Sequence, residues 1–423
     1  MSPQSVTRLR QDLCAAVDSS FEAEHVPWLT RLVDQPSYTG ARDNVERAAQ
    51  IIDEMAATLS MRRVLVPDPS GTFADHRVYS APGVAEDTRA MALVGHVDTV
   101  FPESLGFLRL NRDPPDSESG GDVIRGPGTL DMKSGLSSIV FALRAIARCA
   151  PEVYDGLRVR FVCNSDEEVG SPSSHDLFKE LATRTTSAMV FEAGRVEDRI
   201  ITARKGGGSF RFTMQGKAAH AGNEHAKGVN AIHALALLVP RIEAITDYGR
   251  GITVNVGLVS GGTAKNTVPE TAWCQVDTRF VTREGADYVV AELERIAAAP
   301  FEGMGDVPER AKAARCELSG RVTRLPMEPV EATQVLRRLY EPYAAAQDIG
   351  VGEAPLQGGG SDANLLAGYG VPCIDGLGPW GRAFHSVDEW SSLDSLRRRT
   401  RALACFLVSE AVAGGAAVSG ALA

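Results

Sequence analysis

Ligand-type side chains stand in this sequence where runs typical of buried strands give way to loops. In residues 158–171, RVRFVCNSDEEVGS, an alternating apolar run breaks into polar residues, and the adjacent acids Glu167 and Glu168 follow. The carboxyl ends of strands are where α/β proteins bind ligands, so the two acids are candidates for a site. Alone they decide nothing, because a solvated loop with two mutually repelling acids has the same pattern.

Further segments place an imidazole or a carboxylate at such a junction: His96 and Asp98 in GHVDTV, Asp131 in RGPGTLDMKSG, Glu192 in VFEAG and His385 in FHSVDEW. Each one alone also fits an ordinary role, since a histidine at a strand end is more often a core or capping residue, and Glu192 could be a surface acid. All of these junctions together are expected at one edge of one sheet. Nitrogen and oxygen ligands of this kind suit borderline or hard divalent cations.

Two histidines and three carboxylates are enough ligands for two metal ions. If one carboxylate bridges, each ion has three protein ligands, and open positions remain for water. This is the arrangement of a two-metal hydrolase, whose ions lie about 3.5–4 Å apart. The set of residues therefore indicates metal-dependent hydrolysis.

The strands and helices that must position these residues alternate along most of the chain. Strand-like runs near residues 90–95, 156–164 and 187–194 are separated by helix-like segments at 134–150 and 173–184, which predicts an α/β fold with a mostly parallel sheet covered by helices. After Lys205 the order becomes β-α-β-β-α-β, the ferredoxin-like pattern of a complete small α+β domain. The α/β alternation resumes near Pro326. We therefore expect one α/β domain in two parts, residues 1–206 and 322–423, interrupted by an inserted domain at 207–321.

Length, charge and composition argue against several classes of protein. The chain has 423 residues, too many for one core, and its net charge of −10 argues against a nucleic-acid or anionic-membrane partner. The N-terminal segment is broken by charges, unlike a signal peptide, and no apolar run approaches the roughly 20 residues of a membrane span. The seven cysteines are scattered without a CxxC pair, which suits free thiols in a reducing compartment. We expect a cytoplasmic protein whose Ala/Gly-rich end after Val412 is frayed.

Eight motifs, in order, resemble a known family. They are GHVDTV, RGPGTLDMKSG, SDEEVGS, FEAG, GKAAHAG, GLVSGGTAKNTVPE, GGGSDANLL and FHSVDEW. The sequence is similar to the two-zinc amidohydrolases and exopeptidases that include carboxypeptidase G, acetylornithine deacetylase, succinyl-diaminopimelate desuccinylase and the aminoacylases. The resemblance covers nearly the whole chain, is greatest to the carboxypeptidase G branch, and implies a catalytic α/β domain with an inserted ferredoxin-like lid that dimerises.

The resemblance also implies roles for the candidate residues. One metal ion would be held by His96 and Glu192, the other by Glu168 and His385, with Asp131 bridging both. Asp98 would fix the tautomer of the His96 imidazole. Glu167 would carry a proton from the attacking water to the leaving nitrogen. The peptide between Asp131 and Met132 is expected to be cis.

Further residues are implied to contact the substrate. His220 would reach the active site of the opposite subunit and stabilise the developing oxyanion, while Asn266 and Arg279 would hold the substrate carboxylate. Lys205 matches a position used by the carboxypeptidase G branch, although Lys205 and Arg279 also fit ordinary surface charges. Gly358, Gly359 and Gly360 would let backbone approach the substrate, or else form a turn before a helix capped by Ser361 or Asp362.

Three functions fit this sequence. The first is a carboxypeptidase of the glutamate carboxypeptidase type, the second an N-acyl-amino-acid deacylase, and the third a non-catalytic dimeric binding protein on the same fold. The segment SGRVTRLPM, with Arg321 and Arg324, matches poorly the place of the arginine that reads glutamate, so the released amino acid stays open. The expected cofactors are two divalent ions per chain, zinc, or else cobalt or manganese. The expected partners are a small peptide or N-acyl-amino-acid substrate and a second copy of the chain.

Overall fold

The chain folds into two compact units. The computed structural model describes residues 3–114, 121–195 and 198–412, so the Ala/Gly-rich end after Val412 lies outside the described residues. The first unit comprises Met1–Ala203, Pro329–Gln357 and Ser361–Ala423, and the second comprises Arg204–Glu328 with Gly358–Gly360. The boundaries expected after residues 206 and 321 stay predictions, because a division by contacts does not show which segment folds by itself.

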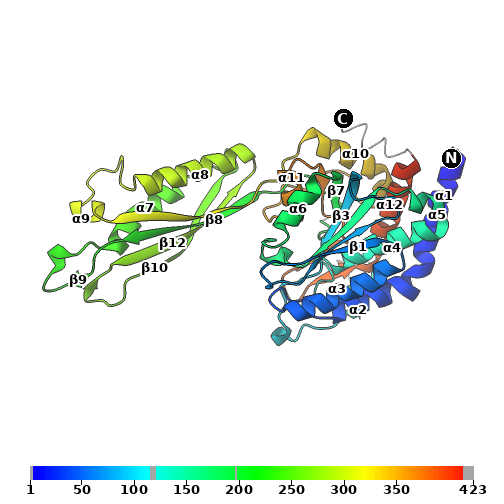
Figure 1. Cartoon of the computed structure of the whole chain (residues 1–423), viewed down its shortest axis with the longest axis horizontal. Coiled ribbons are helices and arrows are strands. Elements are labelled where there is room, and N and C mark those ends of the chain that lie inside the picture. The colour runs from blue at the N-terminus through cyan, green and yellow to red at the C-terminus, as the bar shows by residue number, and fades with distance from the viewer. Residues whose placement is uncertain (1–2, 115–120, 196–197, 413–423) are drawn as a thin grey trace. The chain divides into compact units, whose positions relative to one another are not determined.

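A six-stranded sheet forms the centre of the first unit (Figure 1). Its strands lie in the order β1 (Arg62–Val66), β2 (His76–Ser80), β6 (Val159–Asn164), β3 (Ala90–His96), β7 (Thr185–Val190) and β14 (Cys373–Ile374). β6, β3, β7 and β14 are parallel, while β1 and β2 pair antiparallel and join the sheet through β6. The predicted mostly parallel sheet is therefore confirmed.

Helices cover this sheet. They are α1 (Pro3–Ser20), α2 (Val26–Asp34), α3 (Arg42–Ala57), α4 (Lys133–Cys149), α5 (Pro151–Asp155), α6 (His175–Ala182), α10 (Glu331–Ala345), α11 (Asp362–Gly368) and α12 (Leu393–Val412). α4 and α12 pack against each other, and α4 contacts β3, whereas α6 and α11 contact β7. Because every residue of β3 is buried, both faces of the sheet are shielded from water, as expected for parallel strands.

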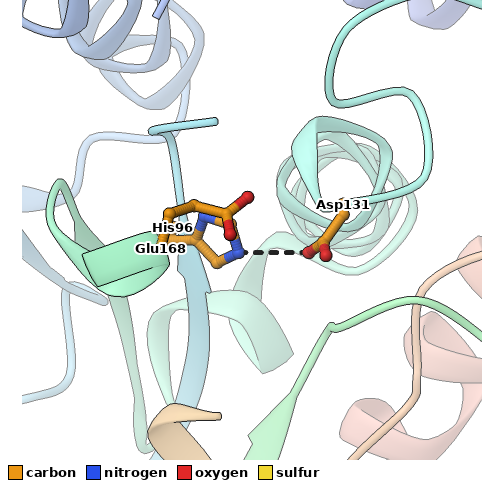
Figure 2. Close-up of side chains that lie close together, drawn as sticks. All are labelled: His96, Asp131 and Glu168. Carbon is orange, nitrogen blue, oxygen red and sulfur yellow. Dashed lines mark hydrogen bonds and ion pairs between the residues drawn. The ribbon is translucent and has the colours of Figure 1, made fainter. Parts of the chain in front are cut away.

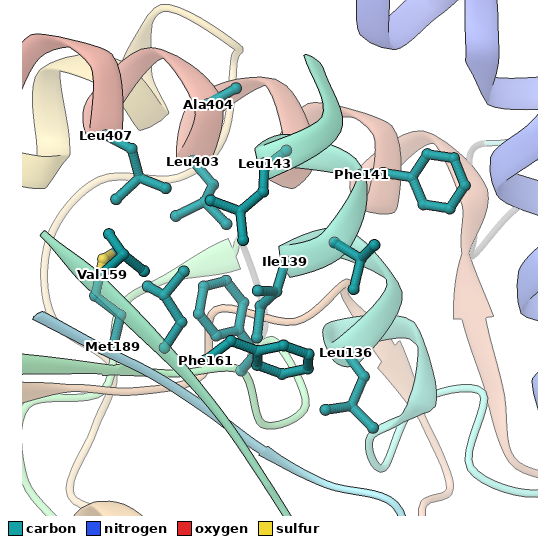
Figure 3. Packing of buried hydrophobic residues seen from close by; sticks show 14 of the residues in the cluster. Leu136, Ile139, Phe141, Leu143, Val159, Phe161, Met189, Leu403, Ala404 and Leu407 are labelled. Atoms are coloured by element: carbon teal, nitrogen blue, oxygen red, sulfur yellow. The ribbon is translucent and has the colours of Figure 1, made fainter. Parts of the chain in front are cut away.

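The hydrophobic core shows why these segments fold as they do. Leu136, Ile139 and Leu143 recur at helical spacing on α4 and meet Phe161 of β6 (Figure 3). Leu403 of α12 closes the same cluster from above. Each fully buried side chain of this kind contributes about 1.5–3 kcal/mol to folding. This packing fixes the strand ends from which the candidate ligands project.

A small antiparallel sheet lies beside the main one in the first unit. It consists of β15 (Gly381–Arg382), β16 (Trp390–Ser392), β5 (Val123–Arg125) and β4 (Asn111–Asp113). Trp390 pairs with Arg125 and Ser392 with Val123, so the segment around His385 is tied to the segment that leads to Asp131. Residues far apart in sequence are thereby brought into one site.

The second unit is a four-stranded antiparallel sheet with two helices. The strands lie in the order β10 (Thr253–Gly261), β12 (Thr271–Phe280), β8 (Gly206–Gln215) and β13 (Arg315–Arg324), and the helices are α7 (Ala231–Glu243) and α8 (Arg283–Ala298). A short helix, α9 (Glu309–Lys312), and the pair β9 (Ala219–His220) with β11 (Thr267–Val268) complete it. The predicted ferredoxin-like order is confirmed. None of the described helices is both long enough and apolar enough to cross a membrane.

Candidate metal centre

Adjacent strand ends deliver the predicted ligands to one place. His96 is the last residue of β3, Glu167 opens a 3₁₀ turn just after β6, and Glu192 follows β7. β6 and β7 flank β3 as parallel neighbours, so their carboxyl ends meet at the same edge of the sheet. Asp131 lies in the turn before α4, and His385 lies between β15 and β16.

Asp131 stands between the two imidazoles. Its Oδ1 lies 3.2 Å from Nε2 of His96, and its Oδ2 lies 3.3 Å from Nε2 of His385. Figure 2 shows the Asp131 carboxylate facing the His96 ring, with Glu168 beside the same ring. A carboxylate whose two oxygens face two different ligand nitrogens has the geometry of a bridge between two cations.

The remaining carboxylates divide between the histidines. Glu168 Oε2 lies 3.1 Å from His385 Nε2, and Glu192 Oε1 lies 3.8 Å from His96 Nε2, which is the division that the resemblance implies. Two overlapping groups have all their ligand atoms within 4.8 Å of one another. One is His96, Asp131 and Glu168, and the other is His96, Glu167 and Glu192. All the predicted ligands and Glu167 thus belong to one cluster, and its shortest contacts are consistent with the predicted pairing, which stays a prediction.

Asp98 does more than the sequence predicts. Its carboxylate and its carbonyl oxygen lie 3.4 and 3.0 Å from His96 Nδ1, so the opposite nitrogen, Nε2, faces the cluster. The same carboxylate accepts hydrogen bonds from the backbone N–H groups of Glu167 and Glu168, each at 3.2 Å. Asp98 thereby positions three candidate residues at once. Thr39, which donates to Asp98 Oδ2 at 2.7 Å, has no signal in the sequence.

The electrostatics of the cluster favour cations. Burial, with the negative charge of Asp131, raises the pKa of Glu168 to about 7, and the same two causes raise the pKa of Glu192. Hydrogen bonds to Asp131 and Glu168 raise the pKa of His385 to about 10. Buried carboxylates that repel one another lose this penalty when divalent cations lie between them. The oxygen and nitrogen donors present therefore fit two such ions.

Glu389 is a buried member of the site that sequence reasoning missed. Its Oε1 accepts hydrogen bonds from the backbone N–H groups of Leu130 at 2.7 Å and of Asp131 at 3.1 Å. Burial raises the pKa of Glu389 to about 8. It follows His385 in the motif FHSVDEW, but spacing alone does not reveal that it holds the backbone of a distant segment. The Asp131–Met132 peptide that it adjoins is cis, as predicted.

His220 and Asn266 lie next to each other in the second unit. His220 pairs with Thr267 across β9 and β11, and Ala221 N–H donates to the carbonyl of Asn266 at 2.9 Å. Nδ1 of His220 accepts the backbone N–H groups of Gly222 at 3.1 Å and of Asn223 at 3.0 Å. A nitrogen that accepts carries no proton, so the exposed His220 ring presents Nε2–H as a donor.

Arg279 of β12 is held by a neighbour on the same strand. Its Nε and Nη2 donate to the two carboxylate oxygens of Asp277 at 2.9 and 3.0 Å. Lys205 is half-buried just before β8. Gly358 and Gly359 are exposed, and Gly359 accepts a hydrogen bond from Arg204 at 3.1 Å.

Gly360 comes directly before the cap of α11. Ser361 is the N-cap, and a capping box joins it to Asn364, so the interpretation of the glycines as a turn before a capped helix is supported. Their contact with substrate stays a prediction.

Comparisons with known proteins agree with this geometry. Residues 202–304 match the model of a peptidase dimerisation domain, M20_dimer. The chain is 26% identical to carboxypeptidase G2 of a Pseudomonas species over 376 residues, 88% of this chain and 85% of that protein. It is 26% identical to succinyl-diaminopimelate desuccinylase of Novosphingobium aromaticivorans over 381 residues, 87% of this chain and 93% of that protein.

Solved structures share the fold. The aminopeptidase PepT of Bacillus cereus has a TM-score of 0.71 at 21% identity, with 92% of this chain and 98% of that chain covered. A dinuclear metal-binding peptidase of the M20 family from Bacillus subtilis has a TM-score of 0.65 at 14% identity, with 92% and 98% covered. The resemblance inferred from the motifs is confirmed, because the chain is similar in sequence to carboxypeptidase G2 and the desuccinylase and in fold to an M20 family peptidase, and residues 202–304 match a peptidase dimerisation domain.

Proposed function

We propose that this protein hydrolyses an amide bond next to a free carboxylate, as a carboxypeptidase of the glutamate carboxypeptidase type. One observation carries the proposal: the two oxygens of Asp131 face two imidazoles, each of which has a further carboxylate within 4 Å. A pair of divalent ions held by His96, Asp131, Glu168, Glu192 and His385 would supply Lewis acidity that polarises the scissile carbonyl and lowers the pKa of water. Zinc is the proposed metal, with cobalt and manganese as alternatives.

Glu167 is the proposed proton carrier. Its carboxylate lies in the ligand cluster, yet it is not among the five ligands, and its backbone is held by Asp98. A carboxylate fixed in this way accepts a proton from the attacking water and returns it to the leaving nitrogen. Asp98 keeps both Glu167 and the His96 ring in place during this transfer.

The second unit is proposed to supply the groups that bind the substrate. The Nε2–H of His220 is a donor suited to the oxyanion, and we propose that it acts in the site of a partner subunit. Arg279, with donors beyond the two that Asp277 engages, is proposed to bind the substrate carboxylate together with Asn266. Lys205 and the glycines 358–360 are proposed as additional contacts.

A homodimer through the second unit is supported by an unpaired sheet edge. β10 is the terminal strand of its sheet and exposes Leu258 and Val259, which are 58% and 60% exposed, and Ile232 on α7 is 41% exposed. An edge strand with exposed apolar side chains is a template for a second copy of the same strand. The seven free thiols support a cytoplasmic location.

Deacylation of an N-acyl-amino acid is the second candidate. The desuccinylase and carboxypeptidase G2 are each 26% identical to this chain, and both activities could use the same centre. A non-catalytic binding role is disfavoured, because the ligands and Glu167 are assembled together.

A substrate panel tests the proposal. Peptides, folate-type glutamates and N-acyl-amino acids are incubated with the protein after loading with zinc, cobalt or manganese, and metal content is measured on the same samples. We expect two ions per chain and release of a free amino acid that chelation abolishes. Full activity with one ion or none would overturn the two-metal proposal. Preference for short N-acyl groups over peptides would replace the carboxypeptidase by the deacylase.

A further inference from the structure

Two thiols face each other where the first and last described helices of the chain pack together. Cys14 of α1 and Cys405 of α12 have their sulfur atoms 3.9 Å apart. The helices are fixed around them by polar contacts, including hydrogen bonds from Arg10 to Ser409 at 2.9 and 3.1 Å. Residues 14 and 405 are therefore neighbours in space although nearly the whole chain separates them.

The two thiols differ in reactivity. The hydrogen bond with Cys405 lowers the pKa of the half-buried Cys14 to about 7, and the charge of Arg401 acts in the same direction. The side-chain amide of Gln347 also donates to the Cys14 sulfur, at 3.6 Å. Cys405 is buried, and its neighbour Cys14 together with burial raises its pKa. A thiol of lowered pKa near solvent beside a buried partner is the arrangement of an attacking and a resolving cysteine.

We propose that Cys14 and Cys405 form a reversible disulfide that joins α1 to α12 when the protein meets hydrogen peroxide. The Cys14 thiolate attacks one peroxide oxygen, the O–O bond breaks, hydroxide leaves, and a sulfenic acid forms. The Cys405 sulfur then attacks the Cys14 sulfur, the S–O bond breaks, and the oxygen leaves as water with the Cys405 proton. The two thiols lose two electrons in total, and the peroxide is reduced to water. A dithiol reverses the reaction by exchange.

The expected consequence is a change in stability rather than in catalysis. A covalent link between residues 14 and 405 restricts the unfolded chain over a very long loop, which stabilises the folded state. Both thiols lie on helices that contribute none of the proposed ligands or substrate contacts. Oxidation should therefore raise the melting temperature and leave kcat unchanged. A link formed only under oxidant also suits a protein of a reducing compartment.

Peptide mapping of the full chain tests this site. After a short treatment with dilute peroxide and alkylation of the remaining thiols, digestion without reductant should yield a cross-linked pair of peptides that contain Cys14 and Cys405. The melting temperature should rise with the yield of this link and return to its initial value with dithiothreitol. If both residues are alkylated as fully as before peroxide, or if the link forms without a thermal shift, the proposal is wrong.

Matched variants identify the reacting pair. Cys149 is a second half-buried thiol beside α1, 3.7 Å from the Asp12 carbonyl, but burial raises its pKa. Cys149→Ser should keep the link and the thermal shift, whereas Cys14→Ser should lose both. Cys405→Ser, whose hydroxyl still offers a donor to the Cys14 sulfur but cannot form a disulfide, should leave Cys14 as a sulfenic acid that dimedone labels. A link from Cys14 to Cys149, or an oxidised Cys405 in Cys14→Ser, would contradict the assigned roles.

Discussion

The predicted functional residues of the two units differ in burial and in the residues that they contact. In the first unit each candidate ligand lies within 4 Å of at least one other and most are buried, with His96 only 1% exposed. In the second unit the side chains of His220 and Arg279 form hydrogen bonds with residues two positions away, Gly222 and Asp277. When all ligands of a site come from one unit, the site can be predicted from ligand-type residues at the ends of successive strands. Residues proposed to contact a substrate or a second subunit have only their orientation fixed by their own unit, so their role is harder to predict.

A similar contrast in exposure exists between the two histidines of the candidate metal centre. The His96 side chain is 1% exposed and held by Asp98, whereas the His385 side chain is 50% exposed on a loop with a positive φ of 63°. Glu389 fixes the backbone at Asp131 between them. The centre thus has a closed side at β3 and an open side at His385. Substrate and solvent are expected to enter on the open side.

The largest expected effect separates two neighbours of the first unit. Glu167→Gln keeps the size of the side chain and removes the carboxylate proposed to carry the proton, so kcat should fall by about two to four orders of magnitude with little change in KM. Glu168→Gln weakens a ligand instead, so its metal content should fall. Kinetics and elemental analysis of the same samples measure both effects.

The opposite pattern of metal content and kcat in these two variants would exchange the roles assigned to Glu167 and Glu168. If Glu167→Gln lost metal while Glu168→Gln kept both ions, Glu167 would be the ligand. Full activity of Glu167→Gln would remove any role in proton transfer. Asp277→Asn in the second unit is the control, because it also deletes one carboxylate charge and should retain both the ions and kcat.

The next effect tests whether the second unit acts across subunits. His220→Ala removes the donor proposed for the oxyanion, so kcat should fall by about 10²–10³-fold. Mixing inactive His220→Ala with inactive Glu167→Ala under subunit exchange should restore part of the activity, because one mixed site then has both groups. Verified heterodimers without any recovered activity would show that His220 does not act in trans.

Sequence reasoning recovered the fold and the members of the cluster, because ligand types at parallel strand ends constrain one another through the sheet. It predicted the ferredoxin-like order, because each strand and helix there has its own apolar period. It did not find Glu389 or Thr39, whose roles depend on hydrogen bonds between segments far apart in sequence. The bond between Arg279 and Asp277 was also missed, because the predicted strand places these residues on one face but does not show that their side chains pair.

A smaller expected effect concerns the KM of variants of Arg279 and Asp277. Arg279→Met should raise KM roughly tenfold to a hundredfold and change kcat less, because hydrogen bonds between charged groups contribute about 1.5–3 kcal/mol. Asp277 competes for the same guanidinium, so Asp277→Asn should lower KM or leave it unchanged. An unchanged KM in Arg279→Met, with kcat intact, would assign the residue to the surface of the second unit and not to the substrate.

The smallest expected effect is a pH dependence of metal binding that the first unit alone determines. A ligand must lose its proton before it binds a cation. His385, with its pKa raised to about 10, is protonated at both pH 6 and pH 8 without metal, so it releases a proton on binding at either pH. Glu168, with its pKa raised to about 7, is mostly protonated at pH 6 and mostly ionised at pH 8, so it releases a proton mainly at the lower pH.

Metal binding should therefore release more protons at pH 6 than at pH 8, and the affinity should fall by up to about tenfold per pH unit below 7 for the Glu168 proton. Calorimetry in buffers of different protonation enthalpy counts the protons at each pH. His220→Ala in the second unit should leave both counts unchanged, whereas Glu168→Gln at saturating metal should reduce the difference between them. Equal counts at pH 6 and pH 8 in the unsubstituted protein would mean that Glu168 does not titrate between these two pH values. Burial and the charge of Asp131 would then not place the pKa of Glu168 near 7.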